Sequence, residues 1–127
     1  MKLYILAGAL CLAAAPAMAL SFTSIALSPS TGAWGKAYGF ATRGEADRTA
    51  IGYCRQHSND PDDCRVVTWS RGEYCASVAV HHKHDGSVVW GSASGPTKDV
   101  AEAKAYDNCV SERGKRCDEI LATVCSH

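Results

Sequence analysis

The chain reads Trp34-Gly-Lys-Ala-Tyr-Gly39 and, 56 residues later, Trp90-Gly-Ser-Ala-Ser-Gly95. Each hexapeptide alternates large or polar side chains with glycine or alanine, and this period of two is typical of a β-strand. The alternation places only small residues on one face of each strand, so that another element can pack very closely there. Because the same stretch occurs twice, we expect two equivalent strands in a duplicated fold.

A helix is predicted after each of these strands. Thr42 and Glu45 have the spacing of a capping box, which begins helices, and Thr97 opens the second segment in the same way. Alanine and cysteine then recur at helical spacing in both copies, as Ala46, Ala50 and Cys54 and as Ala101, Ala105 and Cys109. These small faces match those of the strands, so we expect each helix to lie against its own strand.

Further apolar runs predict strands over residues 22–27, 65–70, 74–81, 87–93 and 119–124. Turn residues separate these runs, including Asp85-Gly86, a strong hairpin signal. The predicted order is β-β-α-β-β-β-α-β, with half-repeats at about residues 34–69 and 90–123. Because hairpins imply antiparallel pairing, the sequence indicates an α+β domain with a mainly antiparallel sheet of about six strands and two helices.

The first 19 residues are interpreted as a signal peptide. Lys2 precedes an apolar run from Leu3 to Ala15, and Ala17-Met-Ala19 has the small-x-small form of a cleavage site. The run is shorter than the roughly 20 residues of a membrane span. We therefore expect cleavage after Ala19, a single mature domain of residues 20–127, and a location in the periplasm or outside the cell.

Cleavage removes Cys11 and leaves six cysteines, an even number that indicates disulfides formed in an oxidising compartment. Six cysteines permit many pairings, and the internal repeat selects among them. In each copy one cysteine ends the helix and another begins the following strand, which predicts two equivalent local bridges and leaves the remaining two cysteines for each other. The expected disulfides are Cys54–Cys64, Cys109–Cys117 and Cys75–Cys125.

Composition and motifs exclude several classes of function. The chain has 13 basic and 13 acidic side chains, and this balance gives no electrostatic footprint for nucleic acid. No second apolar run reaches membrane length. The sequence contains no G-x-S-x-G, and every mature cysteine is assigned to a disulfide, so no nucleophile of these kinds is visible. No cofactor is expected.

The segment from His81 to Asp85 is the candidate for chemistry. On a strand, His82 and His84 project from the same face, and such a pair can bind a metal ion through two imidazoles. A third ligand would come from Asp85 or His127. A solvated hairpin tip is the competing interpretation, since paired histidines at this spacing are common. The alternative function is therefore a small metal-dependent or histidine-using hydrolase centred on this hairpin.

Alternation sends Trp34, Tyr38 and Phe40 to the strand face opposite the small residues. If both helices cover one side of the sheet, Trp69 and Trp90 gather with them on the other side. They form either an open binding surface or, if the sheet curls, a second buried core. We take Trp34, Tyr38 and Trp90 as the candidate binding residues. The leading hypothesis is an exported, non-enzymatic binding protein, such as an inhibitor, an immunity protein or a cell-envelope module. Its partner is expected to be another exported or envelope protein.

Three motifs point to a family: Trp-Gly-x-Ala-Tyr-Gly at residues 34–39, Cys64-Arg-Val-Val-x-Trp69, and the closing Val124-Cys-Ser126. With the alanine-rich helix they resemble the small secreted bacterial domain-of-unknown-function family numbered 4189. The resemblance covers about residues 24–127. It implies a bacterial exported protein with this disulfide framework. It implies no catalytic set, so it assigns no functional role to any residue.

Overall fold

The computed structural model describes residues 21–126, so the expected signal peptide and its cleavage site lie outside the described residues. Within them the order is β-β-α-β-β-β-α-β, which confirms the α+β prediction. The strands are β1 Phe22–Leu27, β2 Trp34–Phe40, β3 Arg65–Arg71, β4 Cys75–His82, β5 Val88–Gly95 and β6 Glu119–Cys125. The helices are α1 Arg43–His57 and α2 Lys98–Arg113, with a single 3-10 turn at Pro61–Asp63.

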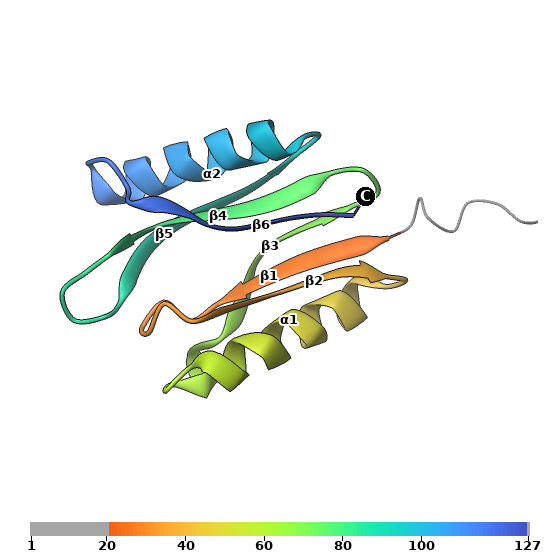
Figure 1. Ribbon diagram of the computed structural model, residues 1–127, viewed down its shortest axis with the longest axis horizontal. Helices are drawn as coiled ribbons and strands as arrows, with labels where there is room; N and C mark the ends of the chain where they lie inside the picture. The colour runs from red at the N-terminus through yellow and green to blue at the C-terminus, as the bar shows by residue number, and fades with distance from the viewer. Residues whose placement is uncertain (1–20, 127) are drawn as a thin grey trace, which may run out of the picture.

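The strands form two antiparallel sheets of three strands each, ordered β2-β1-β3 and β5-β4-β6. The two sheets therefore have the same strand order within each half of the chain. Figure 1 shows them stacked face to face, with α1 covering the outer side of the first sheet and α2 the outer side of the second. The strands predicted for one sheet are thus divided between the two inner layers of a four-layer α/β/β/α sandwich.

The division follows from the middle strand of each sheet, whose inner face is apolar. Ile25 and Leu27 of β1 and Val78 and Val80 of β4 are all fully buried, and they meet in one cluster between the sheets. A sheet face of this kind needs a second apolar layer, because leaving it in water costs about 25 cal/mol for each Å² exposed. Each sheet supplies that layer to the other.

Each helix lies unusually close to an edge strand, as the small faces predict. A Cβ atom added to Gly35 of β2 would lie 2.3 Å from the Ala50 carbonyl oxygen of α1. The corresponding atom on Gly91 of β5 would lie 2.1 Å from the Cys109 backbone nitrogen of α2. Since real Cβ atoms do not approach other atoms so closely, only glycine fits at either position. In both halves, a glycine on the edge strand allows the helix to pack closely against the sheet.

The helices begin where the capping residues predict. The Thr42 hydroxyl oxygen accepts a hydrogen bond from the Glu45 backbone N–H at 3.2 Å, and Thr97 accepts one from Val100 at the same distance. The second hydrogen bond of the predicted capping box, from a backbone N–H to the Glu45 carboxylate, does not form. The Glu45 carboxylate accepts from the Thr42 hydroxyl at 3.0 Å instead of reaching a backbone donor. The N-terminus of α1 is therefore capped mainly by the threonine.

Three disulfides cross-link the described residues, joining Cys54 to Cys64, Cys109 to Cys117 and Cys75 to Cys125. These are the pairs expected from the repeat. The two local bridges each tie a helix to the start of the strand that follows it. The third lies between β4 and β6, where the two cysteines are directly paired in the sheet. Only the second sheet has such a cross-strand bridge.

Candidate binding surfaces

The structure separates the aromatic rings that alternation placed together. Trp34 and Trp90 are half-buried and pack against the cluster between the sheets. Phe40 packs instead with the residues between the first sheet and α1. Tyr38 is 63% exposed. The expectation of one aromatic face is therefore wrong for Phe40, and the remaining rings divide between core and surface.

A β-bulge explains the position of Phe40. Phe22 pairs with Phe40, but Ser24 pairs with Ala37, so β2 holds one more residue than β1 across this interval. Gly39 lies in the extra segment with a φ of 81°, a left-handed conformation that glycine adopts readily. One inserted residue reverses the alternation beyond it. Phe40 consequently points to the same side as Ala37, toward α1.

Trp69 also lies on the helix side of the first sheet. It pairs with Ser24, whose hydroxyl donates to the Asp47 carboxylate on α1. The ring centroid of Trp69 is 6.4 Å from that of Phe22, and the Arg43 guanidinium lies 4.3 Å above the ring. The sequence prediction that Trp69 joins Trp34 and Trp90 is wrong, because β1 and β3 shift register between Ile25 and Ala26.

Trp34 and Trp90 each line one of two equivalent grooves. The first groove, of about 550 Å³, runs between β2 and α1 and is lined by Trp34, Tyr53 and His57 among others. The second, of about 560 Å³, runs between β5 and α2 and is lined by Trp90 and Asn108 among others. Volumes of this size are typical of ligand sites. Both grooves arise beside the glycine that lets the helix approach its strand.

The chemistry of the two grooves differs. Lys36, Tyr53 and His57 line the first groove, and Tyr53 is 48% exposed. In the second groove the Asn108 amide donates to the Ser92 carbonyl oxygen at 2.8 Å, which links the helix to the strand. The first groove is thus the more open to a partner. We call this edge of the first sheet the β2 surface; it comprises the groove residues Trp34, Lys36, Tyr53 and His57 together with the exposed Tyr38 of β2, which lies outside the groove lining.

Helical spacing alone did not identify Tyr53 and His57 as residues of a binding surface. Both follow the spacing of Ala50 and Cys54 along α1, which is the signal available in the sequence. This spacing places Tyr53 and His57 beside the buried residues of α1, on the side of the helix. Their exposure depends on α1 lying over β2 at the edge of the sheet, and this position follows only from the strand order β2-β1-β3.

The histidines at the end of β4 form hydrogen bonds with acidic side chains next to and within β6. His81 and His82 end β4, whereas His84 lies in the turn after it, so the predicted H-x-H pair does not share a strand face. The Nδ1 atom of His81 is 2.9 Å from Asp118 Oδ1, and Nε2 of His82 is 3.0 Å from Glu119 Oε2. These two acids at the start of β6 were missed by the sequence prediction.

No metal site forms at this hairpin in residues 21–126, where no three side chains of His, Cys, Asp or Glu converge as ligands. Asp85 accepts hydrogen bonds from the Ser87 backbone N–H at 2.9 Å and from its hydroxyl at 2.6 Å, which closes the turn. His127 lies outside the described residues. The arrangement does not support a hydrolase.

Asp118 should make stability depend on pH. Hydrogen bonds from the His81 ring and then from the His82 backbone N–H hold the pKa of Asp118 below its ordinary value of 3.8. Folding therefore favours the carboxylate, and its contribution is present above pH 3.8 and is lost as the pH falls below it. We expect Asp118→Asn to lower the urea midpoint at pH 7, and this difference from wild type should disappear in strong acid.

Asp107→Asn, at an exposed position on α2, is the control for this pH experiment. It should leave the urea midpoint close to that of wild type at every pH, because exposed surface substitutions usually change stability little. A deficit for Asp118→Asn that persists unchanged at the lowest pH would show that the charge of Asp118 does not contribute to folding.

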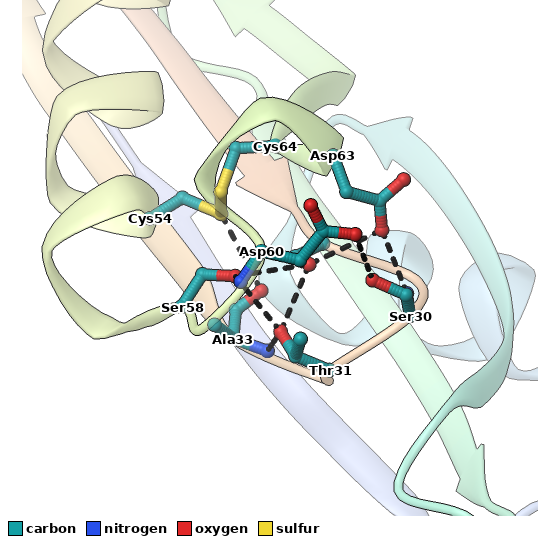
Figure 2. The surroundings of a disulfide bond; sticks show 9 residues. Ser30, Thr31, Ala33, Cys54, Ser58, Asp60, Asp63 and Cys64 are labelled. Atoms are coloured by element: carbon teal, nitrogen blue, oxygen red, sulfur yellow. Dashed lines mark hydrogen bonds between the residues drawn. A yellow bond between two sulfur atoms is a disulfide. The ribbon is translucent and has the colours of Figure 1, made fainter.

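A hydroxyl-rich cluster joins the 3-10 turn at Pro61–Asp63, with the preceding Asp60, to the β1–β2 connection (Figure 2). Ser30 donates its backbone N–H to Asp63 at 2.7 Å and its hydroxyl to Asp60 at 3.0 Å. The backbone N–H of Ser30 is the main reason that the pKa of Asp63 lies below 3.8. The cluster lies beside the Cys54–Cys64 bridge and fixes the loop that begins the first groove.

These features define a class of protein: a disulfide-bonded α+β domain built from two equivalent strand-strand-helix-strand halves. The family model described as "Domain of unknown function (DUF4189)" matches residues 22–125. The chain belongs to this family, as the sequence motifs indicated.

The chain is similar to a protein of known structure, described as the NMR structure of Rv1813c from Mycobacterium tuberculosis. The two share 25% sequence identity with a TM-score of 0.54, over 98% of this chain and 90% of that chain. No curated protein matches the chain. These similarities establish family and fold, and they assign no activity.

The three disulfides fit an oxidising, exported environment. Within residues 21–126, neither helix combines the length and the apolar character that crossing a membrane requires.

Proposed function

We propose that this chain is an exported, non-enzymatic binding protein that recognises another exported or envelope protein through the β2 surface. Its role would be that of an inhibitor, an immunity protein or an envelope module, in the periplasm or outside the cell. The partner would lay an extended segment along β2 and place a side chain in the first groove. Such strand addition gives affinity through the backbone and specificity through adjacent pockets.

The exposure of Tyr38 carries this proposal. The Tyr38 ring is 63% exposed, although Gly35 and Ala37 of the same strand are buried. Tyrosine is enriched at interface centres because it offers a large rigid ring and a polar tip. β2 is also an edge strand of its sheet, so backbone donors and acceptors along its outer side have no partner strand among residues 21–126.

The charge of Lys36 on the β2 surface favours one kind of partner. Lys36 is exposed on the strand, and His57 is exposed at the end of α1. A lysine on an edge strand discourages pairing with a second copy of the same strand, since like charges would meet. A segment with acidic side chains would instead be attracted to this edge.

The other two candidate binding residues have different places in this proposal. Trp34 lines the first groove while packing against the core, so its truncation would damage both fold and binding. Trp90 belongs to the second groove, on an edge strand of the other sheet. Tyr38 is therefore the residue whose removal tests binding with the least effect on folding.

We expect Tyr38→Ala to weaken partner binding at least about tenfold, as truncation of a central aromatic anchor typically does. The mature, oxidised protein is used to retain its partner from periplasmic extract or culture medium. The dissociation constant of the purified partner is then measured for wild type and variant. The melting temperature of the variant should stay close to that of wild type, because the ring is mostly in solvent.

Tyr74→Ala is the matched control for this binding measurement. Tyr74 is 51% exposed but lies between β3 and β4, away from the β2 surface. Its truncation should leave the affinity unchanged. Equal affinities for Tyr38→Ala and wild type would contradict the proposal, and so would unfolding of Tyr38→Ala, since the ring would then be part of the core.

A further inference from the structure

A third pocket, independent of the β2 surface, lies along β3 on the side of the sandwich where β3 and β5 meet. Its volume is about 600 Å³, within the range of small-ligand sites. Trp69 and Tyr74 line it, and they are 38% and 51% exposed. The same lining includes Arg71 and Ser94. Two exposed rings beside a cation and hydroxyls are an unusual surface for a domain of this size.

Trp69 is held in place although it is partly exposed. The Arg43 guanidinium lies 4.3 Å from the centre of its ring, and Arg43 Nε is itself 3.3 Å from Asp47 Oδ2. The Ser24 hydroxyl in turn donates to Asp47. This chain of contacts fixes the indole, and a ring fixed before binding loses little conformational entropy when a ligand stacks on it.

The second half of the molecule shows that folding does not require this arrangement. Ser77 pairs with Thr123 in the second sheet as Ser24 pairs with Trp69 in the first. The Thr123 hydroxyl donates directly to Glu102 of α2 at 2.6 Å, so no cation and no ring are involved there. The duplicated fold therefore accepts a small polar residue at the position of Trp69.

The first sheet also differs from the second at the neighbouring position. Phe22 pairs with Arg71, whereas the second sheet has the Cys75–Cys125 bridge at the end of the same two strands. Within residues 21–126 the Arg71 guanidinium forms no ion pair. An exposed arginine beside two rings provides a planar donor for a carboxylate.

We propose that this pocket binds a saccharide that carries a carboxylate group. The C–H face of a sugar ring is slightly positive and packs on the negative face of an aromatic ring, which Tyr74 and the Trp69 face opposite Arg43 supply. Arg71 pairs with the carboxylate through two parallel hydrogen bonds. Ser94 lines the same pocket, and its hydroxyl binds a sugar hydroxyl. Nothing is cleaved; the pocket is a recognition site.

An extended peptide fits this pocket less well. A strand added to the edge of β3 would need the outward backbone acceptors of that strand. The Val67 carbonyl already accepts a hydrogen bond from the Ser92 hydroxyl of β5 at 2.8 Å. β3 also packs against β5 on this side of the sandwich. A compact polar ligand meets no such obstacle.

The test uses the mature, disulfide-bonded protein labelled with ¹⁵N and titrated with trigalacturonate. Maltotriose is the neutral comparator, and triglutamate carries similar charge on a peptide. We expect chemical-shift changes confined to residues 67–74 and to Ser94. Trigalacturonate should bind at least about tenfold more tightly than maltotriose, because a charge-assisted bidentate contact is lost with the neutral sugar.

Two variants separate the contribution of the Arg71 charge from that of the Trp69 ring to sugar binding. Arg71→Gln should remove most of the preference for the charged sugar, and Trp69→Ala should weaken both sugars about tenfold. Tyr38→Ala, on the β2 surface, should bind trigalacturonate as wild type does. The proposal is overturned if no shifts occur up to about 10 mM sugar, if triglutamate binds as tightly at the same residues, or if Arg71→Gln leaves the preference intact. The measurement on Arg71→Gln remains a test of the proposal even if Trp69→Ala fails to fold.

Discussion

Gly91→Ala should destabilise the domain by about 3 kcal/mol, a large effect for the addition of one methyl group. The added Cβ would lie 2.1 Å from the Cys109 nitrogen, 2.5 Å from the Asn108 carbonyl carbon and 2.7 Å from the Ala105 carbonyl oxygen. All three are backbone atoms of α2, so no side chain can rotate away. The helix must move off β5, and the buried contacts of Ala105 and Cys109 are lost with it.

Urea unfolding of the oxidised protein measures this effect, and Gly52→Ala is its control. Gly52 lies within α1, is exposed, and has no neighbouring atom within 4 Å of an added Cβ. Alanine there should stabilise the domain by about 0.5–1 kcal/mol, since glycine is a poor helix former. Gly35→Ala should resemble Gly91→Ala, because its Cβ meets the Ala50 carbonyl at 2.3 Å. A loss below about 1 kcal/mol in both variants would contradict close helix packing.

The second large effect concerns the long-range disulfide. Replacing both Cys75 and Cys125 by alanine should cost about 4 kcal/mol, compared with about 2.5 kcal/mol for the Cys109 and Cys117 pair, because the unfolded chain gains more freedom from a longer loop. The sequence separations are 50 and 8 residues. Urea unfolding of the two double variants compares them. An equal or reversed order would show that native-state contacts, and not loop entropy, decide the contribution of each bridge.

Local patterns in the sequence predicted much of the fold. The small faces of Gly35 and Gly91 and the caps at Thr42 and Thr97 depend on neighbouring residues, and the structure has each of them. The division into two sheets depends on long-range pairing, which a repeat does not specify. Two copies of one unit can extend a single sheet or stack face to face, and the buried inner faces of β1 and β4 decide for stacking.

Side-chain direction was the weakest part of the prediction. Alternation assumes an unbroken strand, and the extra residue at Gly39 reverses the direction of Phe40. The register shift between β1 and β3 likewise precedes Trp69. The strand was predicted to end at residue 81 and β4 ends at His82, so His84 lies in the turn and could share a strand face with His82 only on a longer strand. Bulges and strand ends depend on partner strands, which single-sequence patterns do not identify.

Site-specific photo-crosslinking in the producing cells tests the proposed binding function most directly. A photoreactive phenylalanine derivative replaces Tyr38 in one variant and Tyr74 in another, two tyrosines that are 63% and 51% exposed. We expect irradiation to yield a discrete adduct with another exported or envelope protein from position 38 and none from position 74. An absence of any adduct at position 38, or the same adduct in equal yield from both positions, would contradict binding through the β2 surface.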